Sequence, residues 1–130
     1  KSLKRKSAGS QLDQIAAAAQ DVKGVKVIAR KIEGVDAGVL RELAEQAAAK
    51  LGSGAVVLGL ASDGKVTLVS AVTKDRQGQL HAGNIVKKVA GLVGGSGGGR
   101  PDFAQAGGKD AEKLDAALHA VYNIVAEFLG

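Results

Sequence analysis

Apolar residues recur three and four positions apart in four stretches of the chain, and this spacing predicts four amphipathic helices. The four stretches are residues 11–21, 37–51, 80–93 and 111–128. Three runs rich in β-branched or other apolar residues predict strands at residues 25–33, 55–61 and 66–72. The order helix, strand, helix, strand, strand, helix, loop, helix predicts an α/β (α+β) fold, in which helices pack on a small mixed β-sheet.

Local signals mark the two ends of the second helix. Asp36 is a good N-cap for residues 37–51, and Gly52 supplies the stop. Val35 and Leu40 occupy the positions of a hydrophobic staple across that cap. The capping chemistry and the periodicity agree, so this helix is predicted with both ends defined.

The middle of the chain predicts a buried strand followed by a tight hairpin. Residues 55–61 form an almost continuous apolar run, which is typical of a strand covered on both faces. Asp63-Gly64 joins this run to the next one and favours an antiparallel hairpin. Because three strands make a marginal sheet, we expect another short strand within residues 100–106, with Pro101 at an edge or at the strand start.

Composition limits the class of protein. A chain of 130 residues is one domain by size, and hydrophobic residues make up 45% of it while aromatic residues make up only 2%. The core must therefore be Ala, Val, Leu and Ile packed closely against glycine backbone. The absence of cysteine excludes disulfides and thiolate metal sites, and His81 and His119 alone cannot form a zinc site.

No membrane or export segment is evident in the sequence. It contains no apolar run of about eighteen residues and no signal-peptide pattern, so we expect no membrane partner and a cytoplasmic location. The chain begins at Lys1 and contains no methionine, which suggests a fragment of a longer protein.

The charge balance favours an anionic partner, most often nucleic acid. The net charge is +5 at pH 7 and the pI is about 9.6. Basic residues gather in two places, Lys1, Lys4, Arg5 and Lys6 at the start, and Lys87, Lys88 and Arg100 near the glycine-rich segment. The alternatives are a solvated helix end or a fraying terminus for the first group, and an ordinary polar helix face for the lysine pair.

Seven glycines fall among the fifteen residues 94–108, directly after the third predicted helix. Ordering glycine costs more backbone entropy than ordering any other residue, so this segment needs a compensating reason such as close contact between its backbone and a ligand. A disordered linker is the alternative, although the insert Arg100–Gln105 has poor linker composition.

The glycine-rich segment does not fit the known nucleotide loops. A Walker loop needs Gly-Lys-Ser/Thr between a strand and a helix, whereas Gly99 is followed by Arg100-Pro101 after a helix. The glycine spacing and context also exclude a dinucleotide fingerprint. What remains is a nest of backbone amide donors, with Arg100 able to make a bidentate contact to a phosphate or a base edge.

Catalysis is poorly supported by the sequence. Neither histidine has a nearby Ser or Cys nucleophile. Asp36 and Asp110 are explained as helix caps and Asp63 as part of the hairpin turn, so no catalytic or metal-binding residue is predicted. Asp102 and Gln105 have no such explanation, and they either bind a ribose or base or hold the segment together.

Several stretches, in the same order along the chain, resemble the C-terminal domain of alanyl-tRNA synthetase, in the DHH-associated domain superfamily. They are residues 24–27 (Gly-Val-Lys-Val), Val35-Asp36 with 40–44 (Leu-Arg-Glu-Leu-Ala), 51–54 (Leu-Gly-Ser-Gly), 63–66 (Asp-Gly-Lys-Val), 72–75 (Val-Thr-Lys-Asp) and 94–108. The resemblance covers about residues 22–128. The chain departs from the commoner pattern at Phe103, Ala106 and Lys109, and related DHH phosphoesterases usually have histidine in place of Arg100.

The resemblance implies that residues 1–21 are the end of a helical stalk and residues 22–130 a DHH-associated-type nucleic-acid-binding domain. It implies a non-catalytic domain of an alanine–tRNA ligase, a class II synthetase, that binds the outer corner of tRNA and couples aminoacylation with editing. The expected partners are tRNA, specifically tRNA(Ala), the other domains of the parent enzyme, and a second copy through the stalk. No cofactor is expected here, since ATP and zinc belong to other domains.

The tRNA-contacting residues that the resemblance and the charge pattern predict are concentrated in the glycine-rich segment. They are Lys87, Lys88, Gly94, Gly95, Ser96, Gly97, Gly98, Gly99, Arg100, Pro101, Asp102, Gln105, Gly107, Gly108 and Lys109. Two alternatives remain: the substrate-binding domain of a DHH-family phosphoesterase, and an oligomerisation module that uses Leu12 and Ile15.

Overall fold

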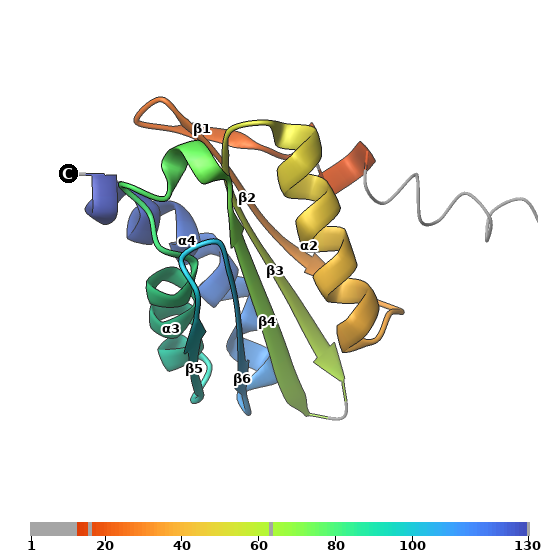
Figure 1. Cartoon of the computed structure of the whole chain (residues 1–130). Helices are drawn as coiled ribbons and strands as arrows, with labels where there is room; N and C mark the ends of the chain where they lie inside the picture. Colours follow the sequence, from red (N-terminus) through yellow and green to blue (C-terminus); the bar gives the residue numbers. More distant parts are fainter. Residues whose placement is uncertain (1–12, 16, 63, 130) are drawn as a thin grey trace, which may run out of the picture.

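The fold of the chain is a six-stranded mixed sheet between two helical layers, as seen in a computed structural model that describes residues 13–15, 17–62 and 64–129 (Figure 1). The strands are β1 (Gln20–Val22), β2 (Val25–Ile32), β3 (Gly54–Ser62), β4 (Lys65–Val72), β5 (Ser96–Gly99) and β6 (Phe103–Gly108). The helices are α2 (Ala37–Leu51), α3 (Ala82–Leu92) and α4 (Leu114–Leu129), with short 3-10 turns η1 (Lys74–Arg76) and η2 (Ala111–Lys113). The predicted fold class is confirmed.

The sheet order is β1-β2-β3-β4-β6-β5, and β2 with β3 is its parallel pair. Because the ends of parallel strands cannot be joined by a tight turn, α2 carries the chain from one to the other. The remaining pairs are antiparallel. As a result β5 forms one edge of the sheet, and β1 with the free part of β2 forms the opposite edge.

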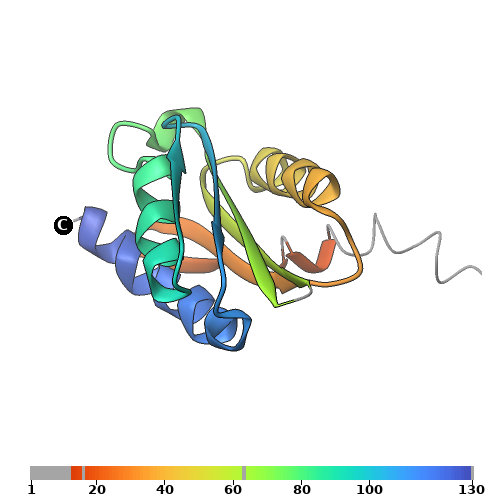
Figure 2. The same ribbon diagram turned by 90° about the horizontal axis from the view of Figure 1, so that it is seen from below.

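Each face of the sheet has its own hydrophobic core. On one face α3 and α4 cover residues such as Val57 and Leu68, and on the other α2 covers residues such as Ile28 and Leu58 (Figure 2). Residues 54–60 of β3 are buried throughout, as predicted for a strand covered on both faces. α2 lies over β3 and β4, so it leaves the same face of β6 and β5 open.

The expected ends of α2 and of the β3–β4 hairpin are confirmed. The Asp36 carboxylate accepts a hydrogen bond from the Val39 amide at 2.9 Å, and Gly52 follows the last turn with φ +83°. Ser62 and Lys65 pair across a two-residue turn in which Gly64 has φ +77°. Asp63 lies outside the described residues.

Residues 20 and 21, expected to end the first helix, belong to strand β1 instead. The turn to β2 explains the difference, since Lys23 and Gly24 both have positive φ and the Asp21 carboxylate accepts the Gly24 amide at 2.7 Å. This turn chemistry and the pairing with β2 outweigh the helix propensity of the preceding residues. Residues 1–12 lie outside the described part of the chain, so the predicted stalk and its boundary remain predictions.

Ile15 is 2% exposed and packs in the core beneath α2. It is therefore not available for contact with a second chain, so Ile15 does not support the alternative of an oligomerisation module. Leu12, the other residue of that argument, lies outside the described residues.

Two expectations for the last third of the chain are corrected. The segment after α3 contains two strands, β5 and β6, where we expected a loop with one short strand. Asp110 does not cap the last helix with its side chain, because the 3-10 turn η2 comes between it and α4. Within the described residues, no helix is long and apolar enough to cross a membrane.

Candidate nucleic-acid interface

The glycine-rich segment folds into a hairpin at one edge of the sheet, here called the glycine hairpin (residues 96–108). Ser96 lies opposite Gly107, and Gly99 lies opposite Ala104. β5 is the last strand of the sheet, and all four of its residues are exposed. With a single hydroxymethyl group among its side chains, this edge presents mainly peptide groups to its surroundings.

The turn of the glycine hairpin is fastened to the start of α3. The amide of Ala82 donates to the Pro101 carbonyl at 2.9 Å, and the amide of Gly83 donates to the Arg100 carbonyl at 3.2 Å. A Cβ at Gly83 would lie 2.7 Å from the carbonyl oxygen of Gly99, so this glycine allows α3 and β5 to touch. The turn is thus held in place by the helix behind it.

His81 has a structural role at the same helix start. Its Nδ1 accepts a hydrogen bond from the Asn84 amide at 3.2 Å and caps α3. The first amides of α3 are therefore engaged by groups of the protein itself. The helix start does not offer them to a phosphate.

Close packing within the protein explains several glycines of the glycine-rich segment 94–108. A Cβ at Gly95 would collide with the carbonyl oxygen of Gly107, and a Cβ at Gly97 would collide with Ala106. Gly94 ends α3 with φ +68°, which favours glycine. At these positions the lack of a side chain lets the two strands and α3 approach one another, and no ligand is needed to explain it.

Two glycines face open space instead. A Cβ at Gly98 would meet nothing within 4 Å, and one at Gly107 would touch only the Val66 carbonyl oxygen, at 3.4 Å. Gly107 and Gln105 are both exposed and lie on the side of β6 that α2 leaves open. Close approach of a ligand to backbone is therefore possible at this face of the hairpin.

The predicted basic residues are only partly brought together. The side chain of Arg100 is 75% exposed and its Nε lies 3.4 Å from the Asp102 carboxylate, so the two form an ion pair at the turn. Lys109 lies at the other end of the hairpin, where its amide donates to the Val93 carbonyl at 2.9 Å. The hairpin therefore carries one cationic group at each end.

The lysine pair on α3 divides between two surfaces. Lys88 lies 3.5 Å from the Glu127 carboxylate and 5.6 Å from the Phe128 ring centre, so it points toward α4. Lys87 follows Gly83 by one helical turn and is exposed on the side of α3 that borders β5. Of the two lysines, only Lys87 lies where it can act together with the hairpin.

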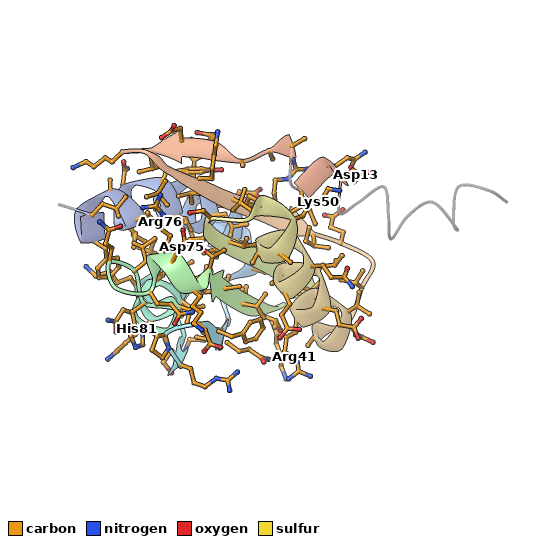
Figure 3. All side chains as sticks on the ribbon, turned by 45° about the horizontal axis from the view of Figure 1, so that its top comes forward. Asp13, Arg41, Lys50, Asp75, Arg76 and His81 are labelled. Atoms are coloured by element: carbon orange, nitrogen blue, oxygen red, sulfur yellow. The ribbon has the colours of Figure 1, made fainter. Side chains whose placement is uncertain are left out.

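A groove of about 540 Å³ beside the hairpin contains residues that the sequence analysis did not assign to a site. Its lining is Asp36, Gly38, Val39, Arg41, Glu42, Glu45, Arg100 and Phe103. The sequence did contain a hint of this groove. Arg41 and Glu42 belong to the stretch 40–44 that resembles the family, and both are exposed, so the fold alone does not require them. With three carboxylates against two guanidinium groups, the groove is not a simple phosphate site. Figure 3 shows Arg41 on α2, away from Asp75 and Arg76 of η1.

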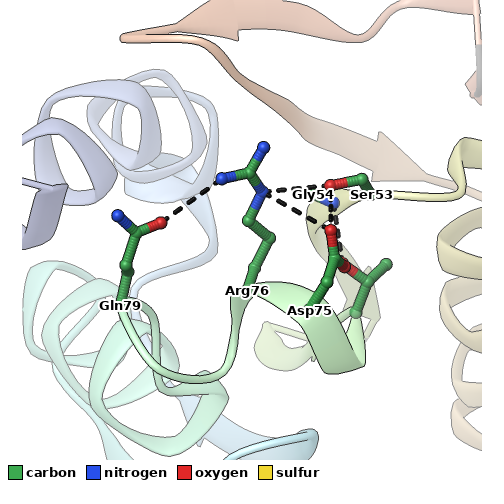
Figure 4. Close-up of polar contacts among 6 residues, drawn as sticks. Ser53, Gly54, Asp75, Arg76 and Gln79 are labelled. Atoms are coloured by element: carbon green, nitrogen blue, oxygen red, sulfur yellow. Dashed lines mark hydrogen bonds and ion pairs between the residues drawn. The ribbon is translucent and has the colours of Figure 1, made fainter.

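A polar network at η1, which the sequence analysis did not predict, joins two of the stretches that resemble the family, residues 51–54 and 72–75. The Asp75 carboxylate accepts hydrogen bonds from the hydroxyls of Ser53 (2.5 Å) and Thr73 (2.6 Å) (Figure 4). The Arg76 guanidinium donates to the Ser53 hydroxyl at 3.0 Å and to Gln79 at 3.3 Å.

This network ties the end of α2 to the loop after β4. The Thr73 hydroxyl also accepts the Gly54 amide at 2.8 Å. The hydrogen bonds from Ser53 and Thr73 lower the pKa of the Asp75 carboxyl below its usual range, because they stabilise its charged form. The network is a structural clamp, since its polar groups satisfy one another.

Comparison with known proteins finds the DHHA1 domain family, which matches residues 24–127. The chain is 50% identical over 127 residues to an alanine–tRNA ligase from Shewanella loihica, and 52% identical over 124 residues to one from Cupriavidus necator. These alignments cover 98% and 95% of the chain but 14% of each relative. The chain therefore spans about one seventh of the length of these relatives.

Solved structures agree with the sequence matches. The C-Ala domain of alanyl-tRNA synthetase from Aquifex aeolicus superposes with a TM-score of 0.77 at 26% identity, covering 83% of this chain and 97% of that one. A DHH-domain member of the s1p family of ribosomal proteins (TM-score 0.62, 13% identity, 95% of this chain and 31% of that one) shares the fold. So does a pGpG-specific phosphodiesterase from Vibrio cholerae (TM-score 0.52, 12% identity, 95% of this chain and 40% of that one).

Proposed function

The chain belongs to the DHHA1 domain family, and on that premise we propose that it is the tRNA-binding C-terminal domain of an alanine–tRNA ligase. In this role it holds the outer corner of tRNA(Ala) while the aminoacylation and editing centres, in other domains of the parent enzyme, act on the same molecule. The identity of about one half to alanine–tRNA ligases, over nearly the whole chain, supports this choice of parent enzyme. The setting is the cytoplasm.

One structural observation carries the proposal, the exposed edge strand β5 with the open face of β6 beside it. Folded RNA offers phosphates and 2′-hydroxyls on its surface. Backbone amides can donate hydrogen bonds to both, and backbone carbonyls can accept hydrogen bonds from the hydroxyls. Gly98 and Gly107 leave the approach to that backbone free of side chains. Arg100, Lys87 and Lys109 supply positive charge around it.

The mode of binding follows from this surface. Shape and phosphate contacts dominate, because the hairpin offers Phe103 as its only aromatic side chain. The proposed contact with a second copy of the chain runs through the stalk. The reactions themselves belong to the other domains, and this domain contributes the position of the tRNA.

A salt titration tests the proposal. Binding of this chain to a tRNA(Ala) transcript is followed by fluorescence anisotropy between low and physiological salt. The logarithm of affinity is expected to fall with the logarithm of salt by about 0.7 to 0.9 for each phosphate contacted. Absence of binding at low salt would overturn the proposal.

A pair of variants locates the binding surface. Arg100→Ala is expected to weaken binding and reduce the salt slope by about 1. Lys26→Ala is the matched control, because Lys26 is an exposed cation on β2, far from the hairpin. Equal losses in the two variants would show a general charge effect and contradict the assignment to the hairpin.

A further inference from the structure

The face of the glycine hairpin that α2 leaves open continues onto the start of β4. Opposite residues of antiparallel strands lie on the same face of a sheet. Thr67 pairs with Gly107, and Gly107 pairs with Ser96, so these three residues lie side by side across the three strands. Gln105 pairs with Val69, whose side chain packs in the core beneath α2, so Gln105 lies on this face too. The α2-side face of β5, β6 and residues 65–67 of β4 is here called the open strip.

The middle of the open strip is flat and polar. Ser96, Gln105 and Gly107 are exposed, and Thr67 is half-buried. Two hydroxyls and one amide therefore point away from the sheet, around a glycine whose added Cβ would touch only the Val66 carbonyl oxygen. A hydroxyl and an amide can each donate and accept hydrogen bonds. The middle of the strip can thus bind a ligand that carries hydroxyl groups.

Two lysines stand at one end of the open strip. Lys65 begins β4 and Lys109 follows the last residue of β6, and both are exposed. The register that pairs Val66 with Gly108 places the two lysines opposite each other, one position further along. Side chains alternate along a strand, so Lys65 lies on the face of Thr67. Neither ammonium group has an ion-pair partner among the described residues.

Two arginines stand at the other end, where the open strip meets the groove beside α2. Arg100 lies at the turn of the glycine hairpin, where its amide donates to the Phe103 carbonyl at 3.1 Å. Arg100 and Arg41 both line the groove, one from the turn and the other from α2. Glu42 and Glu45 line the α2 side of the same groove. An anion is therefore attracted to the guanidinium groups and repelled from the rest of α2.

We propose that the open strip binds the sugar–phosphate backbone of one RNA strand, laid along β6. The two lysines hold a phosphate at one end, and the two arginines hold another phosphate at the other end. The ends are six residues of β6 apart, roughly 20 Å, so the strip spans several consecutive nucleotides. Between the ends, Thr67, Ser96 and Gln105 make hydrogen bonds to ribose 2′-hydroxyls, and Gly107 lets the sugar approach.

This inference rests on the proposed function, because it takes RNA as the ligand. It adds a direction for the RNA strand, a phosphate contact at Lys65 and recognition of ribose. A strand of protein is a poorer match, since it would pair with the exposed edge of β5 through its backbone and would need neither the face of the sheet nor its cations.

The phosphate contact is tested with two lysines of the same sheet. Lys65→Gln is expected to weaken binding to a tRNA(Ala) transcript about five-fold and to reduce the salt slope by about 0.7 to 0.9, as for one lost phosphate contact. Lys26→Gln is the matched control, because Lys26 pairs with Gly54 at the start of β3, whereas Lys65 pairs with Ser62 at its end. Equal losses in the two variants would overturn the inference.

Ribose recognition is tested by comparing the transcript with DNA of the same sequence, both by fluorescence anisotropy. The wild-type chain is expected to bind the RNA at least about five-fold more tightly. The double variant Thr67→Val, Gln105→Leu should lose most of this preference by weakening RNA binding alone, because a damaged fold would weaken both. Gln20→Leu, which removes an exposed amide from β1 at the opposite edge, is the control and should keep the preference.

The outcomes separate this inference from the proposed function. If the wild-type chain binds tRNA but binds DNA equally well, or if the double variant keeps the full preference for RNA, ribose recognition by the open strip is refuted and the proposed function stands. If the wild-type chain does not bind tRNA at low salt, the proposed function itself is refuted.

Discussion

The two edges of the sheet present opposite kinds of surface. At the β5 edge, side chains are nearly absent and the backbone itself is exposed. At the β2 edge, Lys31 of β2 and the side chains of His119 and Tyr122 on α4 line a cleft. One edge is built for contact through peptide groups, and the other for contact through charged and aromatic side chains.

The difference shows that a glycine-rich segment has two separate uses. Gly95 and Gly97 lack side chains because β6 occupies that space, and Gly98 has φ +158°, which favours glycine, whereas Gly107 lacks a side chain at an open surface. The first use stabilises the fold, and the second permits approach of a ligand. The number of glycines in the segment does not distinguish these uses. Substitutions distinguish them, because one kind changes the stability of the fold and the other changes the affinity for the ligand.

The largest effect is expected from Gly95→Ala. The added methyl group would collide with the Gly107 carbonyl oxygen, and neither backbone can move without breaking the pairing of the glycine hairpin. A loss of about 3 kcal/mol in the free energy of unfolding is expected. Urea denaturation followed by circular dichroism measures it. A variant as stable as the wild-type chain would contradict the packing role.

Gly107→Ala should separate binding from stability. Its methyl group would touch only the Val66 carbonyl oxygen, at 3.4 Å, so the free energy of unfolding should change by less than about 1 kcal/mol. The methyl group would stand on the open face, and tRNA affinity is expected to fall about five-fold or more. Anisotropy titration and urea denaturation of the same preparation measure both. Full affinity would show that RNA does not approach this face closely.

The smallest effect is expected at Asp75, which belongs to neither edge. Its pKa is lowered in the folded chain, so the carboxylate stabilises the fold above the unfolded pKa of about 3.9, and this stabilisation is lost as pH falls through the folded pKa. The stability difference between wild type and Asp75→Asn should therefore shrink from pH 7 to pH 3. Urea midpoints across this range measure it, and tRNA affinity at pH 7 should stay unchanged. A difference that is constant with pH would contradict the network.

Much of the scaffold was predictable, and the reason is local. The Asp36 cap, the Gly52 stop and the buried stripe of α4 each depend on residues within a few positions of one another. The Asp63-Gly64 turn is likewise specified by adjacent residues. Residues 20 and 21 were predicted wrongly because the positive φ values at Lys23 and Gly24 turn the chain back onto β2.

The site was less predictable, because its parts come from distant segments. The glycine-rich string marked the hairpin, but only the contact of Gly83 with Gly99 shows what some glycines do. Lys87 and Lys88 look equivalent in sequence, yet one borders β5 and the other pairs with Glu127 on α4. The η1 network joins residues more than twenty positions apart.

Periodicity, turn chemistry and ordered motifs depend on neighbouring residues, so α2, α3, α4, the buried strand β3, the hairpin turn and the family could all be predicted from the amino-acid sequence. The strand at residues 96–99 depends on packing, because glycine has little strand propensity and β6 and α3 hold this segment in place. The tertiary structure also decided which glycines face open space. The meeting of β2 with α4 in one cleft is a property of the packed sheet alone, since it joins side chains about ninety positions apart.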